Sequence, residues 1–299
     1  MTNKTIISES GHVFNGWVKD KNNPHAVLHR PKAVRLPDVI NMIASCPKVR
    51  DQGQVGSCTG HGIGGIMTGT LIQLSAFTEW ESVNWIYNGA RFLEGTLNQD
   101  AGAMPDDCFT WLTNNGSLLE HFFPYAGVLN TDDPNNFKGN AEFFTGFQAV
   151  RVDNGIDGIK SALADGHLVA IGTPWPDSWE VQSGILPEID GSASIAGGHE
   201  TFLYGYDVTK GVFFGQNSWG AGWGIQGHYT MPMSAFQVFK DSFGGYDAHY
   251  VTFTATPVPV PPPPTPSNCP IGKALAKAGN VPLKVLGRNG RFVYMDGVK

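Results

Sequence analysis

The chain has 299 residues, with 20 Lys and Arg against 26 Asp and Glu, and its formal net charge is −6 at pH 7. Charged residues make up only 15% of the chain and hydrophobic residues 41%, a composition that excludes an intrinsically disordered protein and favours a folded one with a core. The acidic balance argues against nucleic acid as the main ligand of the molecule. Four cysteines are too few for a scaffold built of disulfides.

The N-terminal residues show no targeting signal, since residues 1–11 lack the apolar core of a secretory signal. The most apolar stretch, residues 63–77, is interrupted by glycines and polar residues and is shorter than the roughly 20 apolar residues that cross a bilayer. We therefore expect a soluble protein with no signal peptide and no membrane span. Its compartment is open, with a bacterial cytoplasm or a phage-associated location as the expectation.

The elements follow in chain order from a polar, weakly periodic arm at residues 1–31. A helical pattern then covers a glycine-rich apolar stretch from residue 57, residues 83–93 and residues 105–112. Strand-like patterns follow, with one helix at 157–164 among them, at residues 143–152, 168–173, 201–206, 212–217 and 228–231. Helices first and strands second predict an α+β protein with a helical lobe and a β lobe, in one domain at residues 32–256.

A proline-rich linker at residues 257–267 separates this domain from a tail at residues 268–299. Such a run favours polyproline II and acts as a semi-rigid spacer, the alternative being an ordered surface loop. The tail has six cations against one anion, which indicates a tether to a partner, a surface or an assembly. Residues 283–286 and 291–295, separated by glycines and an asparagine, predict a hairpin.

Cys58 is the first candidate catalytic residue. It follows Gly56 and Ser57 at the start of the apolar helical stretch, so its thiol is predicted to lie at a helix N-terminus. The helix dipole and the free N–H groups there stabilise a thiolate. A buried structural cysteine is the alternative.

A thiolate nucleophile needs an imidazole partner, and His199 is the best candidate among nine histidines. It follows Gly197 and Gly198, whose lack of side chains allows another segment to approach. The alternative is a histidine satisfied by the backbone at a strand edge. His61 is a weaker candidate, because it lies a turn behind the thiol on the same helix.

The segment from Gly215 to Gly224 contains four glycines and two tryptophans besides Asn217. The Asn217 amide oxygen is of the type that accepts a hydrogen bond from an imidazole and orients its ring. A carbohydrate-binding aromatic platform is the competing interpretation of the loop.

Together, Gln52, Cys58, His199 and Asn217 occur in an order and setting that resembles the papain-like cysteine peptidases. The Gly-Gly-His and Asn-Ser-Trp-Gly-x-Gly-Trp-Gly segments are similar to two further signatures of that family. The resemblance runs from about residue 36 to residue 253 and is closest to the prokaryotic, xylellain-like branch. It implies a papain-like fold of two lobes with the active-site cleft between them.

The resemblance also implies the roles of the site residues. Cys58 would attack the scissile carbonyl, and His199 would protonate the leaving amine and then activate water. Asn217 would orient His199 under the cover of Trp219, and the Gln52 side chain would stabilise the oxyanion together with the Cys58 N–H. Substrate-binding residues would include Gly102, Ala103, Met104, Gly197, Gly198 and Trp219. No metal and no cofactor are expected.

Some features depart from the family pattern. Thr59 and Val55 stand where plant and animal members usually have tryptophan and a disulfide cysteine. Cys46 and Cys108 are left as a possible pair. No long prosegment is expected before Cys58. By analogy with the family, the arm at residues 1–31 would lie across the cleft and cover it. The alternative is an ordinary extended N-terminus.

A cysteine endopeptidase that acts on a peptide or protein substrate is the leading functional hypothesis. Ala103, Met104 and Gly197 predict an apolar specificity pocket for the side chain two residues before the cut, although Met104 is equally suited to the core. The alternatives are a Cys–His amidase of cell-wall peptides and an inactive adaptor on a peptidase fold. In either alternative the tail would supply the tether.

Overall fold

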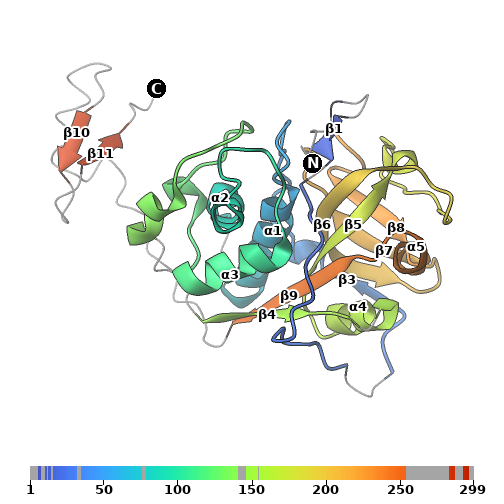
Figure 1. The fold of residues 1–299 in the computed structure, drawn as a ribbon. Helices are drawn as coiled ribbons and strands as arrows, with labels where there is room; N and C mark the ends of the chain where they lie inside the picture. The colour runs from blue at the N-terminus through green and yellow to red at the C-terminus, as the bar shows by residue number, and fades with distance from the viewer. Residues whose placement is uncertain are drawn as a thin grey trace. The chain divides into compact units, whose positions relative to one another are not determined.

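Three helices form one lobe of the protein: α1 (Cys58–Ser75), α2 (Val83–Glu94) and α3 (Pro105–Asn115) (Figure 1). The Ser82 side chain caps α2 by accepting a hydrogen bond from the Trp85 N–H, and Gly95 ends the helix with a φ of 72°. Proline stands in the first turn of α3, as the sequence predicts. The predicted helical lobe is therefore present in the computed structural model.

The other lobe is a seven-stranded sheet with the order β4-β9-β5-β6-β7-β8, in which β3 also pairs with β6. Every pairing is antiparallel. The strands are β3 (Val39–Asn41), β4 (Phe147–Arg151), β5 (Val169–Pro176), β6 (Ile195–Asp207), β7 (Val212–Gln216), β8 (His228–Pro232) and β9 (Asp247–Phe253). The helices α4 (Gly155–Ala164) and α5 (Ala235–Ser242) accompany the sheet. This architecture confirms the predicted α+β class, with a helical lobe and a β lobe.

The predicted element bounds differ from the structure at one place that matters for the site. The strand predicted from residue 201 begins at Ile195, so Gly197, Gly198 and His199 belong to β6. These residues pair with β5, with Gly198 opposite Pro174. Glycine is depleted from strands in general, and here the ladder with β5 overrides that local preference. The strands β3 and β9 and the helix α5 were not predicted.

Glycines allow α1 to lie unusually close to the sheet. A Cβ built on Gly65 would lie 2.5 Å from the ring of Phe202, and one on Gly69 would lie 2.1 Å from a Leu168 methyl carbon. Glycine costs about 1 kcal/mol relative to alanine in a helix interior, so the close contact with β5 and β6 offsets a weak helix propensity. The first residue of α1 is thereby held next to β6.

Each lobe has its own core. One cluster lies between α1, α2, α3 and the near side of the sheet and includes Trp85, Trp111 and Phe202. The second lies within the β lobe and includes Trp175, Trp179 and Phe213. Because the first cluster includes residues of the sheet, it also joins the helical lobe to the β lobe.

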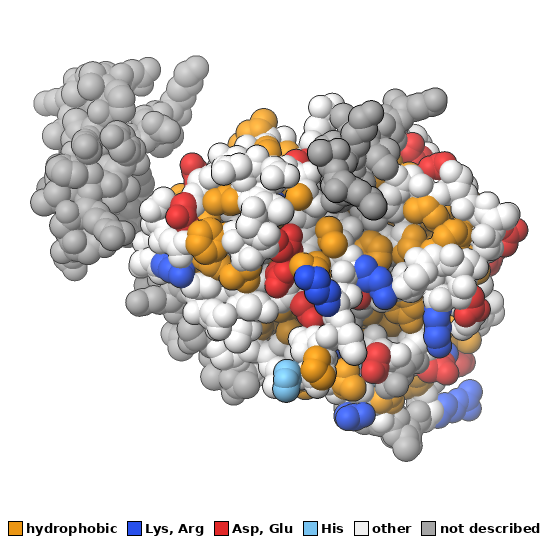
Figure 2. Space-filling view, viewed as in Figure 1, with side chains coloured by type: hydrophobic (Ala, Val, Ile, Leu, Met, Phe, Trp, Pro, Cys, Tyr) orange, Lys and Arg blue, Asp and Glu red, His pale blue; other side chains and the backbone are white. Residues whose placement is uncertain are grey.

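Residues 6–7, 11, 13–14, 16–31, 35–75, 79–140, 146–153, 155–253, 283–286 and 292–295 are described by the structure. Two further short strands pair near the N-terminus, β1 (Ile6–Ile7) and β2 (Val13–Phe14). Four short 3-10 helices lie at Ile43–Ser45, Glu120–Phe122, Pro134–Asn140 and Asp177–Trp179. On the face drawn in Figure 2, acidic and basic side chains are interspersed. Among the described residues no helix has the length and apolarity to cross a bilayer.

The chain divides into residues 1–258 and residues 259–299. In the second unit, β10 (Leu283–Leu286) pairs antiparallel with β11 (Phe292–Met295), which confirms the predicted hairpin. The predicted linker at 257–267 and the remainder of the tail lie outside the described residues.

Trp111 supplies a test of the helical lobe. Its ring lies 5.0 Å from that of Trp85, and a Cβ on Gly89 would lie 2.2 Å from it. Trp111→Ala is expected to lower the free energy of unfolding by about 3–5 kcal/mol because it leaves a cavity. Val128→Ala, at a side chain that is 65% exposed, is the control and should change it by less than about 0.5 kcal/mol. Urea unfolding followed by tryptophan fluorescence measures both, and equal midpoints for the two variants would contradict the assignment.

Candidate active site

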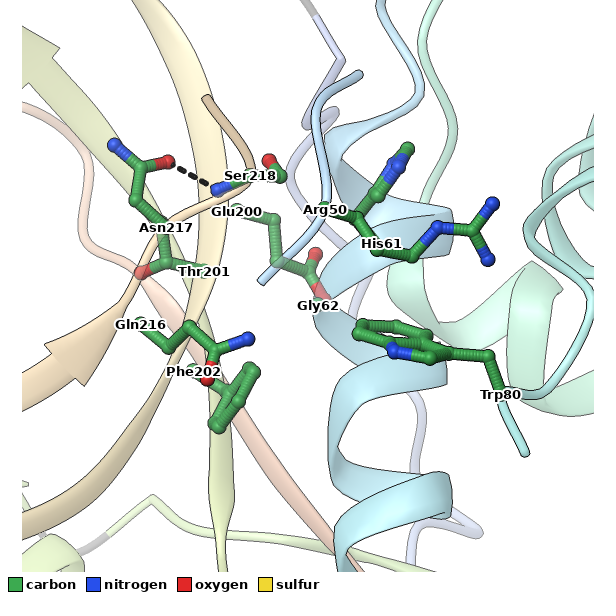
Figure 3. A pocket seen from close by; sticks show the side chains of 10 residues that line it. All are labelled: Arg50, His61, Gly62, Trp80, Glu200, Thr201, Phe202, Gln216, Asn217 and Ser218. Atoms are coloured by element: carbon green, nitrogen blue, oxygen red, sulfur yellow. Dashed lines mark hydrogen bonds between the residues drawn. The ribbon is translucent and has the colours of Figure 1, made fainter. Parts of the chain in front are cut away.

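A buried histidine–asparagine pair forms the centre of the site. His199 Nε2 lies 2.8 Å from Asn217 Oδ1, and both residues are buried. Because an amide oxygen only accepts, Nε2 carries the hydrogen and Nδ1 is the nitrogen suited to exchange a proton. Asn217 Oδ1 also accepts from the Ser218 N–H at 2.7 Å (Figure 3). These contacts define the orientation of the imidazole ring.

Aromatic rings enclose this pair. Trp219 stacks on His199 with ring centroids 4.7 Å apart, and Trp175 meets it edge-on at 4.8 Å. Phe14 of the N-terminal arm contacts both His199 and Trp219. Such an apolar enclosure strengthens the hydrogen bond that it covers, because water cannot compete for it. Trp219 therefore lies where the sequence places a shield.

Cys58 is the first residue of α1, as predicted, and its side chain is fully buried. Its backbone N–H belongs to the first turn, where no partner exists within the helix. Burial raises the pKa of the Cys58 thiol well above its ordinary value, while the Glu200 backbone N–H acts in the opposite direction. Desolvation therefore favours the protonated thiol at this buried position, and the thiolate role of Cys58 stays a prediction.

Gln52 joins the two lobes beside this site. Its backbone N–H donates to the Ser218 carbonyl at 2.8 Å, and its Oε1 accepts from the Ser218 hydroxyl at 2.5 Å. Its Nε2 donates to the Val55 carbonyl at 2.9 Å, three residues before the thiol. The amide is consequently fixed between the loop that precedes Cys58 and the loop that holds Asn217.

The N-terminal arm runs between the helices and the sheet (Figure 1). A Cβ built on Gly16 would lie 2.3 Å from Cys58 Sγ. The Gly16 carbonyl accepts from the Ala103 N–H at 2.9 Å and from the Thr59 hydroxyl at 2.7 Å. The arm therefore occupies the place where a substrate carbonyl would have to approach Cys58.

Residues 17 and 18 continue this strand-like attachment. The Val18 N–H donates to the Ala103 carbonyl at 3.0 Å, which completes a parallel bridge between Trp17 and Ala103. The Trp17 N–H donates to the Gly198 carbonyl at 3.5 Å. The arm thus pairs with one residue from each lobe, in the manner of an added β-strand.

An ion-pair network fastens the arm farther along. Asp20 and Asp106 both accept from Arg151, at 3.0 and 3.1 Å. His249 Nε2 lies 3.5 Å from Asp20 and 3.6 Å from Asp106. Burial and the neighbouring charge of Asp247 raise the pKa of Asp20 to about 8. These carboxylates, which together with His249 have the ligand types of a metal site, are engaged with Arg151 and serve to attach the arm.

The six substrate-binding residues expected from the sequence take different positions. Ala103 and Gly198 bond to the arm, whereas Gly197 pairs with Trp175 in β5. Gly102 has a φ of 74° and donates its N–H to the Tyr87 hydroxyl, and Met104 precedes α3. Trp219 covers His199. Four of these residues carry no side chain beyond a methyl group, so they contribute backbone and space.

Sequence reasoning missed Thr59, Trp17 and Asp247 as residues of the cleft. Thr59 was treated only as a departure from the family pattern, yet its hydroxyl bonds to the arm. Asp247 opens β9, whose alternation of apolar residues from Ala248 was a usable strand signal. That signal does not say which strand β9 pairs with, so it could not place Asp247 in the cleft.

The rival base, His61, belongs to a different environment. Its Nδ1 donates to the Ser57 carbonyl at 3.0 Å, which orients the ring. Burial lowers the pKa of His61 to about 3. With Glu200 and Gln216 it lines a small polar cavity of about 10 Å³ (Figure 3). His61 is therefore neutral, and its ring packs edge-on against Tyr125 with the centroids 4.8 Å apart.

The other thiols do not form the pair that the sequence left open. Cys46 and Cys108 are both free, and Cys108 is fully buried in the helical core. Burial raises the pKa of each of these thiols, which keeps both protonated and unreactive. Cys269 lies outside the described residues.

Comparison with known proteins gives one family. Residues 36–239 match the family model described as papain family cysteine protease. An uncharacterized peptidase C1-like protein of Acanthamoeba polyphaga mimivirus is 26% identical over 215 residues, which cover 67% of each chain. The thiol protease aleurain of Arabidopsis thaliana is 29% identical, over 62% of this chain and 52% of its own. The chain thus spans only about half the length of that plant relative.

Solved structures share the fold. Xylellain, a cysteine protease from Xylella fastidiosa, superposes with a TM-score of 0.70 at 24% identity, covering 80% of this chain and 96% of its own. Digestive procathepsin L 3 of Tenebrio molitor superposes with a TM-score of 0.62 at 18% identity, over 75% and 73% of the two chains. The family expected from the motifs, and the similarity to xylellain, are thereby confirmed.

The contact between Gly16 and the thiol yields a prediction. In Gly16→Ala the new methyl group has no room beside Cys58 and the Gly56 carbonyl, so the arm has to leave the cleft. Alkylation of Cys58 by iodoacetamide, followed by peptide mass mapping, is expected to become at least about tenfold faster, because thiol reactivity follows exposure and thiolate content.

Gly139→Ala is the matched control, since a Cβ there meets no atom within 4 Å. Its labelling rate should equal that of the unaltered chain. Equal rates for Gly16→Ala and Gly139→Ala would contradict the placement of the arm over the thiol.

Proposed function

Because the chain belongs to the papain family of cysteine proteases, we propose that it hydrolyses peptide bonds with Cys58 as nucleophile and His199 as proton carrier. The observation that carries this assignment is the 2.8 Å hydrogen bond between His199 and Asn217, beside a thiol at the first residue of α1. An endopeptidase acting on peptides or proteins is the function this arrangement supports best.

In the reaction, the Cys58 proton passes to His199 Nδ1, and the sulfur attacks the scissile carbonyl carbon. The tetrahedral oxyanion collapses to a thioester while His199 returns the proton to the departing amine. Water then loses a proton to His199 and attacks the thioester, which releases the acid and restores the thiol. Asn217 keeps the imidazole aligned through each transfer.

Two donors are available for the oxyanion. One is the backbone N–H of Cys58, in the first turn of α1, where the helix dipole also favours negative charge. The other is the Gln52 Nε2, which has a second hydrogen beyond the one it donates to Val55. Preorganised donors of this kind contribute about 3–4 kcal/mol each to acyl transfer.

The arm at residues 1–31 serves in this proposal as an inhibitory cover. The Gly16 carbonyl bonds to Ala103 and Thr59 rather than to the proposed oxyanion donors. It therefore blocks the thiol without presenting a carbonyl for attack. Opening the cleft both exposes Cys58 and removes the burial that raises its pKa.

The adaptor alternative is disfavoured by the intact hydrogen bonding of the buried site. A binding-only protein has no need to orient His199 through Asn217, or to secure Gln52 through two bonds to Ser218. A cell-wall peptide remains a possible substrate of the same chemistry, since the peptide bond and the catalytic groups would be the same.

Activity in the Gly16→Ala background tests the assignment. Cys58→Ser is expected to reduce hydrolysis of fluorogenic peptides to background. Asn217→Ala should lower kcat by about tenfold or more, because the imidazole loses its orientation. A biotinylated epoxysuccinyl peptide should label Cys58 in the background variant.

His61→Asn is the control, since its amide preserves a donor toward the Ser57 carbonyl. This variant should retain most of the kcat. Full activity in Cys58→Ser, or loss of activity only in His61→Asn, would disprove the assignment.

The tail at residues 268–299 is proposed to tether the protein through its positive charge. The full chain is expected to elute from a heparin column at higher salt than a chain that ends at residue 256, because each released counterion adds to the salt dependence. Peptide hydrolysis by the two forms, both carrying Gly16→Ala, should be equal. Coincident elution would count against a charge-based tether.

A further inference from the structure

We infer that the cleft contains a selectivity pocket, floored by Asp247, which takes from the substrate a long side chain ending in N–H donors, with arginine preferred. This inference rests on the proposed peptidase function and names its substrate class. It replaces the apolar pocket expected from Ala103, Met104 and Gly197. The evidence is the manner in which the arm occupies the pocket.

Trp17 fills a space that two glycines leave open. A Cβ built on Gly172 would lie 2.0 Å from Trp17 Nε1, and one built on Gly198 would lie 2.8 Å from Trp17 Cε3. Gly172 lies on β5 and Gly198 on the adjacent β6. The two missing side chains create a slot that accommodates a flat group.

Asp247 lies at the far end of this slot. It is directly opposite Gly172 in the pairing of β5 with β9. Its Oδ2 accepts from Trp17 Nε1 at 2.9 Å, so the indole reaches the carboxylate with its only polar atom. Three neighbouring strands therefore build the slot. The strands β5 and β6 form its sides, and β9 supplies the acceptor at its end.

Two donors from the arm reach the Asp247 carboxylate. Besides Trp17 Nε1, the Asp20 backbone N–H donates to Oδ2 at 2.9 Å. Asp247 is only 7% exposed. When the arm leaves, the carboxylate loses these two bonds, and a side chain that fills the slot again without a donor would bury it unpaired, which is costly. An entering side chain with N–H donors restores them.

The surrounding charge favours a cation over a neutral donor. Burial, followed by the neighbouring Asp20 and Asp247, raises the pKa of Glu200, so Asp247 lies among acidic groups that an entering cation would stabilise. The nearby cation, Arg151, is bonded to Asp20 and Asp106. A charge-assisted bond is roughly twice as strong as a neutral one, and a guanidinium is flat and binds carboxylates in a bidentate way. Arginine therefore combines the shape of the indole with the better charge.

The test uses the full chain carrying Gly16→Ala and a fluorogenic library that varies each of four positions before the scissile bond. At one position, arginine is expected to exceed leucine in kcat/KM by about tenfold or more, with tryptophan between them, since one buried charged hydrogen bond has that magnitude. Preference for leucine at every position would overturn the inference.

Adding Asp247→Asn should lower the arginine-to-leucine ratio by about tenfold and the tryptophan-to-leucine ratio less, because an amide oxygen still accepts from an indole. Asp157→Asn is the control of equal charge change, at a side chain that is 88% exposed, and should keep the arginine-to-leucine ratio. An unchanged ratio in Asp247→Asn would also overturn the inference.

Gly172→Ala provides a second route if Asp247→Asn does not fold. Its methyl group narrows the slot and should lower the tryptophan-to-leucine ratio; an unchanged ratio would contradict the inference. Labelling of Cys58 by the epoxysuccinyl probe verifies the folded site in each variant. Failure of the proposed function has a different signature, since no library member would then be cleaved by the Gly16→Ala chain.

Discussion

The close approach of α1 to the sheet is the constraint on which the site depends. Gly62, Gly65 and Gly69 remove the side chains that would separate this helix from β5 and β6. The distance is short enough for the Glu200 backbone, next to His199, to influence the pKa of Cys58. The thiol and the imidazole come from different lobes, so this contact brings together the segments that carry the proposed nucleophile and its proposed base.

The same contact explains why one extended segment is enough to close the cleft. Residues 16–18 bond to Ala103 on one side and to Gly198 on the other, and they fill the space beside the thiol. Closure removes water from Cys58, and the lost hydration outweighs the stabilisation that a helix terminus offers a thiolate. The proposed control of reactivity therefore operates through burial of the thiol.

The contacts of the arm also indicate which kind of substrate the cleft is proposed to bind. Its backbone uses acceptors that a peptide would use, and its one large side chain at the site, Trp17, ends on Asp247. In the proposed inhibitory role, the arm is held by these hydrogen bonds to Asp247 as well as by the apolar contacts of Trp17. Inhibition and substrate selection would then depend on one pocket.

The sequence by itself determined the family, the α+β class and the four residue types of the proposed chemistry, because each signal is local. A cysteine after Gly-Ser at a helix start and an asparagine in a glycine–tryptophan loop are visible in a few neighbouring residues. The tertiary structure alone decided that the arm lies over the thiol, that Cys46 and Cys108 are unpaired, and that Asp247 accepts a hydrogen bond from Trp17 of the arm. Those facts follow from strand pairing and packing between distant segments, and no local pattern states which segment meets which.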